Sequence, residues 1–166
     1  MNLPIRTIAV LGASPTGCRL AAQLAGAGYR TILEDLSGQC RGRAPAGVEL
    51  AQDLHRVAAE ADLILEAAPD DFETKFEVYT LIDRAAPPRS IFASTSPVWP
   101  VAEIASFTYR SAQVLGLWVR PDDRLEVVPG PETSTDTLEA VTQVARNLPL
   151  WNAKTFSWND KTASGP

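Results

Sequence analysis

The sequence has few of the residues from which metal and redox sites are built. Its 166 residues include one histidine, His55, and two cysteines, Cys18 and Cys40. The cysteines do not form a CxxC pair and have no histidine close to them in the sequence. We therefore expect no metal site and two free thiols in a reducing cytoplasm. His55 is expected to have a structural or surface role.

Positive charge and long apolar runs are also scarce. Lys and Arg number 15 against 20 Asp and Glu, which gives a net charge of −5 and argues against nucleic acid or an anionic membrane as a partner. No apolar run approaches the length of a membrane span, and the N-terminus lacks the apolar segment of a signal peptide. These features predict a cytoplasmic protein.

Short apolar runs alternate with helical patterns along the chain. Strands are expected at about 6–11, 30–34, 48–50, 63–66, 90–94, 114–119 and 125–128, and helices at about 15–27, 52–60, 71–85, 101–106 and 134–148. This alternation predicts an α/β fold, a single Rossmann-type domain with a doubly wound, mostly parallel sheet, over residues 1–150. Residues 151–166 are expected to form a C-terminal extension, either an added strand or an interface segment.

The most informative stretch is residues 7–17, where an apolar run turns at Gly12 and a helical pattern begins at Gly17. Such a strand–turn–helix unit directs free N–H groups at one point and favours a phosphate there. Asp35 follows about 20 residues later, the spacing typical of the carboxylate that holds an adenosine ribose. A carboxylate there favours NAD over NADP. The middle glycine of the usual fingerprint is Ser14, which either crowds the ligand or donates a hydrogen bond to it. The alternative is an α/β domain whose turn holds no ligand.

Four segments carry a resemblance to a known family. They are 61–75 (ADLILEAAPDDFETK, similar to ADLVIEAVPEDLELK), 85–96 (AAPPRSIFASTS, similar to APPGAILASNTS), 114–117 (VLGL, similar to the start of VIGLHFFNP) and 125–134 (LEVVPGPETS, similar to LVEVVPGPETS). Over most of residues 5–148 the chain resembles the NAD-binding N-terminal domain of the 3-hydroxyacyl-CoA dehydrogenase family.

This resemblance implies NAD as the cofactor and, by analogy, a connection with fatty acid metabolism. The candidate cofactor-binding residues are Gly12, Ser14, Thr16, Gly17, Asp35, Asp70 and Lys75. For two of them other roles are open, because Asp70 could favour a helix N-terminus and Lys75 could be a solvated surface lysine. Glu66 and Asp71 cluster with Asp70 at the same edge and would titrate abnormally if buried, although helix-cap and surface roles are alternatives.

The resemblance fails at the catalytic positions. Trp118 stands where the family has its histidine base, and an indole accepts no proton. Pro97 replaces the family's serine and Thr95 its asparagine. Glu126 matches the acid that orients the histidine, and it has no histidine to orient. The long helical hairpin that helps bind coenzyme A is reduced to a loop around residues 36–47, and the helical second domain is expected to be missing.

Three functions remain open on this basis. The chain could be a catalytically silent NAD(H)-binding accessory or sensor. It could instead be a small NAD-dependent oxidoreductase of 3-hydroxyacyl-CoA dehydrogenase type, completed by a partner or by oligomerisation. It could also be a domain that has lost its ligand and serves only in assembly.

Aromatic residues gather near the C-terminus. Trp151, Phe156 and Trp158 follow the last expected helix, and Trp99 and Trp118 are expected in the same half of the domain. A monomer seldom exposes so much contiguous apolar surface, so we expect a homodimer formed through this C-terminal surface. The alternative is that the segment forms one more strand and packs on its own domain.

Overall fold

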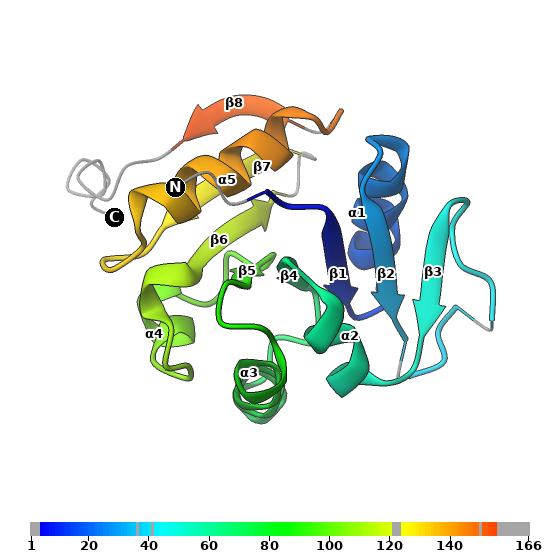
Figure 1. Ribbon diagram of the computed structural model, residues 1–166, viewed down its shortest axis with the longest axis horizontal. Coiled ribbons are helices and arrows are strands. Elements are labelled where there is room, and N and C mark those ends of the chain that lie inside the picture. Colours follow the sequence, from blue (N-terminus) through cyan, green and yellow to red (C-terminus); the bar gives the residue numbers. More distant parts are fainter. Residues whose placement is uncertain (1–3, 36, 41, 121–123, 150, 156–166) are drawn as a thin grey trace.

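The computed structural model describes residues 4–35, 37–40, 42–120, 124–149 and 151–155. Its centre is one sheet with helices on both faces (Figure 1). The strands are β1 (Thr7–Leu11), β2 (Arg30–Glu34), β3 (Val48–Ala51), β4 (Leu63–Glu66), β5 (Ile91–Ser94), β6 (Val114–Val119), β7 (Leu125–Pro129) and β8 (Trp151–Thr155). The helices are α1 (Pro15–Gly26), α2 (Leu54–Glu60), α3 (Phe72–Ala85), α4 (Val101–Ala105) and α5 (Thr135–Arg146), with a 3-10 turn at Ser111–Gln113.

The eight strands lie in the order β3-β2-β1-β4-β5-β6-β7-β8. Neighbours from β3 to β6 are parallel, β6 and β7 are antiparallel, and β7 and β8 are parallel. The chain leaves β1 in one direction toward β2 and β3 and later continues from β4 in the other direction. Parallel strands that diverge in this way open a crevice at their carboxyl ends, between β1 and β4, which is where Rossmann-type folds bind ligands.

Both faces of the sheet are buried, which is why its strands appear in the sequence as unbroken apolar runs. Ile8 and Val10 of β1 pack with α1 and α5 on one face. Ala9 and Leu11 point to the other face and pack with α2, α3 and α4. Side chains at four helix N-termini accept a backbone N–H and fix where each helix begins; they are Ser14, Asp53, Asp71 and Ser134.

The predicted α/β class and the mostly parallel sheet are confirmed, and the strands and helices begin and end within about two residues of the expected positions. Residues 151–155 form a strand beside β7. Phe156 and Trp158, on which the predicted dimer surface depends, lie outside the described residues. In the described part of the chain, no helix is long and apolar enough to cross a membrane.

Candidate functional site

The turn between β1 and α1 has the backbone that the sequence motif predicts. Gly12 has φ +98°, and a Cβ there would lie 2.8 Å from the carbonyl oxygen of Ala67, at the end of β4. A Cβ on Gly17 would lie 2.0 Å from the carbonyl oxygen of Gly12. Both positions therefore require glycine, the first for its positive φ and the second for close packing of α1 on the turn.

Ser14 is the N-cap residue of α1. Its Oγ accepts a hydrogen bond from the N–H of Gly17 at 3.1 Å. Pro15, the first helical residue, has no N–H. One donor of the first turn is therefore engaged and another is missing, so the helix N-terminus offers fewer free N–H groups to an anion than a three-glycine turn does.

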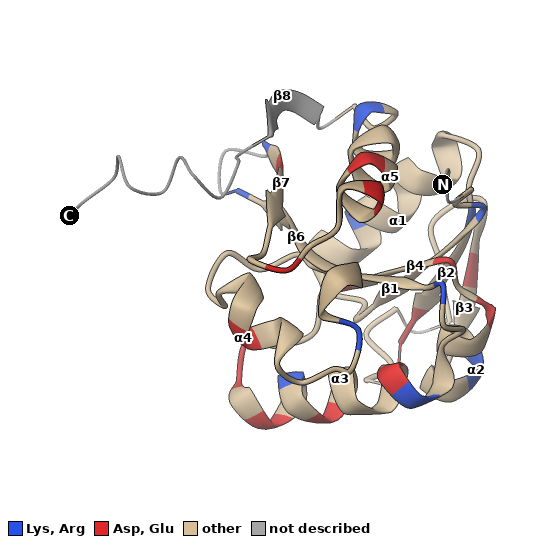
Figure 2. Cartoon of the chain, turned by 60° about the vertical axis from the view of Figure 1, so that its left-hand side comes forward, with Lys and Arg blue, Asp and Glu red and all other residues tan. Residues whose placement is uncertain are grey.

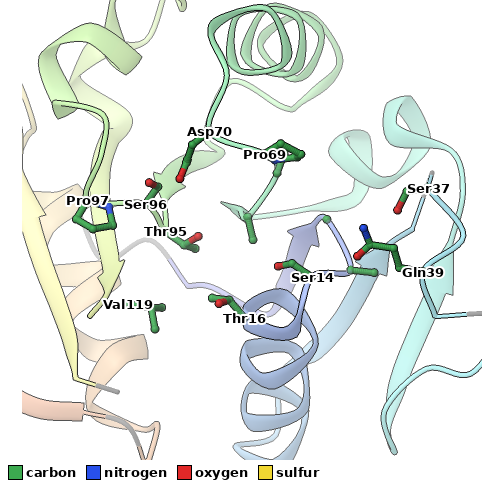
Figure 3. A pocket seen from close by; sticks show the side chains of 14 residues that line it. Ser14, Thr16, Ser37, Gln39, Pro69, Asp70, Thr95, Ser96, Pro97 and Val119 are labelled. Atoms are coloured by element: carbon green, nitrogen blue, oxygen red, sulfur yellow. The ribbon is translucent and has the colours of Figure 1, made fainter. Parts of the chain in front are cut away.

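A cavity of about 420 Å³ opens at this turn, along the carboxyl ends of β1, β4 and β5. Figure 3 shows Ser14 and Thr16 at its centre, with Ser37 and Gln39 on one side and Thr95 and Pro97 on the other. Asp70 is the one charged residue among the described residues that line it. The cavity is thus a mostly neutral cleft at the switch point of the sheet, where Rossmann-type folds bind their ligands.

Asp35 directly follows β2 and does not line this cavity. Its carboxylate accepts the backbone N–H groups of Gln39 and Cys40, each at 2.8 Å, and the hydroxyl of Ser37 at 3.4 Å. The residue is only 1% exposed. The carboxylate thus orders the segment 37–40, and Ser37 and Gln39, rather than Asp35, line the cavity.

Lys75 is buried, so the surface alternative for this residue is wrong. Although α3 carries both acidic and basic positions (Figure 2), Lys75 points inward and is fully enclosed. Its Nζ donates to Glu66 Oε1 and Oε2 at 2.8 and 2.9 Å and to the carbonyl oxygen of Ala68 at 3.0 Å. Asp70 Oδ1 lies 3.1 Å away. The ammonium group therefore ties α3 to the end of β4, directly below the cavity.

Glu66 is equally buried and holds this cluster together. It accepts the N–H of Ala68 at 2.6 Å, and the hydroxyl of Tyr79 lies 3.4 Å from its Oε2. Burial raises the pKa of the Glu66 carboxyl, although Lys75 opposes the shift. Of the three acids in this cluster, Glu66 is therefore the fully buried one. Asp71 is instead the exposed N-cap of α3.

Of the positions that match the family's catalytic residues, Thr95 and Pro97 line the cavity, whereas Trp118 and Glu126 do not. Trp118 of β6 is opposite Glu126 of β7, and its ring occupies space that a Cβ on Gly116 would fill, 2.5 Å from Nε1. Arg120 lies over the Trp118 ring at 5.0 Å and pairs with Glu126 at 2.6 Å. Glu126 thus has a guanidinium partner, which the sequence did not lead us to expect. Pro97 is exposed and lines the cavity.

His55 is exposed on α2, away from this cavity. Among the described residues, no group of three or more metal-binding side chains is present.

Comparisons with known proteins show the family of this chain. The family model described as "3-hydroxyacyl-CoA dehydrogenase, NAD binding domain" matches residues 41–150. A probable 3-hydroxybutyryl-CoA dehydrogenase of Bacillus subtilis (strain 168) is 28% identical, over 88% of this chain and 61% of that protein. A 5-formyl-3-hydroxy-2-methylpyridine 4-carboxylate 5-dehydrogenase of Mesorhizobium japonicum is 23% identical, over 88% of this chain and 56% of that protein. The chain thus spans about three fifths of the length of these relatives.

Solved structures show the same fold. The (S)-3-hydroxybutyryl-CoA dehydrogenase of Ralstonia eutropha superposes with a TM-score of 0.77 at 18% identity, over 93% of this chain and 65% of that one. A diketoreductase superposes with a TM-score of 0.77 at 23% identity, over 90% of this chain and 65% of that one. NAD is the cofactor that the family description names. The chain belongs to the family of 3-hydroxyacyl-CoA dehydrogenase NAD-binding domains.

Proposed function

We propose that this chain binds NAD(H) in the cavity at the β1–α1 turn and that, on its own, it does not catalyse 3-hydroxyacyl-CoA dehydrogenation. It would then act as a nucleotide-binding accessory or sensor. The observation that carries the proposal is the pairing of a turn that keeps Gly12 and Gly17 with a tryptophan at the position of the catalytic base.

The turn supports binding of the cofactor's pyrophosphate. Gly12 makes the tight turn and Gly17 lets α1 pack closely on it, and Gly12, Ser14 and Thr16 line the cavity. The adenosine end would lie toward Ser37 and Gln39, and the nicotinamide end toward Thr95. The hydrogen bond from Gly17 to Ser14 competes with the phosphates, so we expect weaker affinity than in a relative with three glycines.

Asp35 supports a preference for NAD over NADP. Its carboxylate would accept hydrogen bonds from the ribose hydroxyls and repel a 2′-phosphate. Since both of its oxygens already accept backbone N–H groups and the residue is almost fully buried, the ribose can reach it only if the segment 37–40 moves.

The residues around Trp118 support the lack of turnover. An indole cannot take the proton of a substrate hydroxyl, and the guanidinium of Arg120 covers its ring. Glu126 is engaged by Arg120 and is not free to orient a base. Loss of a general base alone lowers a rate by about two to four orders of magnitude.

The test is NADH oxidation with acetoacetyl-CoA, for the wild type and for Trp118→His. We expect neither protein to turn over at an ordinary enzyme rate. The variant should stay inactive because Pro97, at the position of the family's serine, supplies no hydroxyl. Turnover by the wild type would contradict the proposal. A rate per chain that rises with protein concentration would point instead to an oxidoreductase completed by a second copy.

A homodimer formed through the aromatic C-terminal segment is part of the proposal, as is location in the cytoplasm. Sedimentation at tens of micromolar should give a dimer, and Phe156→Asp or Trp158→Asp should dissociate it. A wild-type monomer would contradict the dimer. If either variant unfolds the protein instead, the segment belongs to the core of its own domain.

A further inference from the structure

The two cysteines of the chain meet between α1 and the loop that follows β2, although they are 22 positions apart. Cys18 is in the first turn of α1 and Cys40 is in the loop that follows β2. Their Sγ atoms are 3.6 Å apart, and both residues are partly exposed free thiols. The sequence predicted free thiols and gave no sign that they are neighbours.

Each cysteine is also tied to a different part of the candidate nucleotide site. The thiol of Cys18 donates to the carbonyl oxygen of Ala13, in the glycine turn, at 3.4 Å. The backbone N–H of Cys40 donates to Asp35 at 2.8 Å. The sulfur pair therefore lies between the turn where the phosphates would bind and the segment that covers the ribose carboxylate.

We propose that Cys18 and Cys40 are a modification site: a low-molecular-weight disulfide of the glutathione disulfide class oxidises them to an intrachain disulfide. We also propose that this bond weakens nucleotide binding, a consequence that rests on the proposed function, whereas the disulfide itself does not.

The reaction is a two-step thiol–disulfide exchange. One protein thiol loses its proton, and its sulfur attacks the small disulfide, breaking that S–S bond to form a mixed disulfide and release one small thiol. The second protein thiol then loses its proton and attacks the protein sulfur of the mixed disulfide, which releases the second small thiol. The protein gives up two electrons and two protons, and the small disulfide takes them up.

The geometry suits this exchange. A disulfide requires a sulfur–sulfur distance of about 2.05 Å, so the two atoms need to approach by roughly 1.5 Å. Cys40 is partly exposed in the loop that follows β2, so the movement falls on a loop rather than on a helix or strand. The pKa of the Cys40 thiol is raised to about 11, mainly by desolvation and to a lesser extent by the hydrogen bond with Cys18. The thiolate is the reacting form, so oxidation should become faster as the pH rises.

The expected consequence follows from the position of Asp35. The ribose reaches this buried carboxylate only if the segment 37–40 moves away from it. A bond from Cys40 to Cys18 fastens the segment to α1 and so depletes the conformation that accepts the nucleotide. Depleting a binding-competent form tenfold raises the apparent Kd by about tenfold.

The experiment compares the wild type with Cys18→Ser and Cys40→Ser, each incubated with glutathione disulfide and then freed of it. A chromogenic thiol reagent counts free thiols, peptide mapping locates the bond, and calorimetry measures the Kd for NADH before and after reduction with dithiothreitol. For the wild type we expect loss of both thiols, a Cys18–Cys40 peptide pair, and a Kd raised about tenfold that reduction restores. Cys18→Ser should form no intrachain bond with the oxidant, and after reduction it should bind NADH as the reduced wild type does.

Three results would overturn parts of this inference. Glutathione retained on the wild type as a stable mixed disulfide, with no Cys18–Cys40 pair, would contradict the modification site. If the disulfide forms and the Kd for NADH is unchanged, the claim that this bond weakens nucleotide binding is contradicted. Absence of NADH binding by the reduced wild type would contradict the proposed function, whereas the thiol count would still decide whether the disulfide forms.

Discussion

Replacing Lys75 with methionine should destabilise the protein strongly, because it leaves the Glu66 carboxylate buried without its counter-charge. Lys75 and Glu66 are both fully enclosed, and the ammonium group makes two hydrogen bonds to the carboxylate, at 2.8 and 2.9 Å. Removing one partner of such a pair costs about 3–5 kcal/mol. For a domain of this size that is a fall in Tm of about 10 °C.

The loss should depend on pH. The folded-state pKa of Glu66 is already raised by burial and rises further once Lys75 is gone. A carboxyl with a raised folded-state pKa contributes stability that is fully present below its unfolded pKa, which is about 4.3. That contribution is lost as the pH rises through the folded-state pKa. The free energy of unfolding of Lys75→Met should therefore be closest to that of the wild type near pH 5 and furthest below it near pH 8.

Urea unfolding at several pH values measures both effects. The matched control is Glu66→Gln combined with Lys75→Met, which removes both charges and should recover a large part of the lost stability. The buried-pair account would be refuted if Lys75→Met lowered the free energy of unfolding by less than about 1 kcal/mol. It would also be refuted if the decrease were the same at pH 5 and pH 8. If that variant keeps its stability and loses NADH affinity, Lys75 is instead a direct cofactor contact.

Three further substitutions test the site. Gly17→Ala places a Cβ 2.0 Å from the Gly12 carbonyl oxygen, so urea unfolding should show a loss of at least about 1–3 kcal/mol. Ser14→Gly frees the Gly17 N–H, and calorimetry should show NADH binding that is roughly two- to tenfold tighter, the equivalent of about 0.5–1.5 kcal/mol; weaker binding would mean that the serine donates to the ligand. Gly116→Ala forces the Trp118 indole to move, which should lower the Tm and shift the tryptophan fluorescence; an unchanged spectrum would contradict the packing described here.

The fold could be predicted from the sequence because its signals are local. Strands buried on both faces give short apolar runs, and the glycine turn marks the first crossover. The doubly wound, mostly parallel sheet was predicted from the alternation of strands and helices together with the resemblance to a known family. The added strand at residues 151–155 remained one of two alternatives, since short apolar segments at a chain end also suit an interface.

The surroundings of the site were harder to predict because they depend on contacts between distant residues. Lys75 is four and seven positions before Tyr79 and Ile82, so it shares their inward stripe on α3, and that spacing was the available sign of burial. The partner of Glu126 is Arg120, which the β6–β7 hairpin brings beside it. No local pattern indicates the meeting of Cys18 and Cys40, because the loop after β2 brings the two sulfur atoms together only in the folded chain.

The central claim, a family member that holds the cofactor without the catalytic base, is tested most directly by calorimetric titration of the reduced protein with NADH and with NADPH. The account predicts one NADH site per chain and weaker binding of NADPH, because the carboxylate of Asp35 repels a 2′-phosphate. Absence of NADH binding, or tighter binding of NADPH, would contradict it.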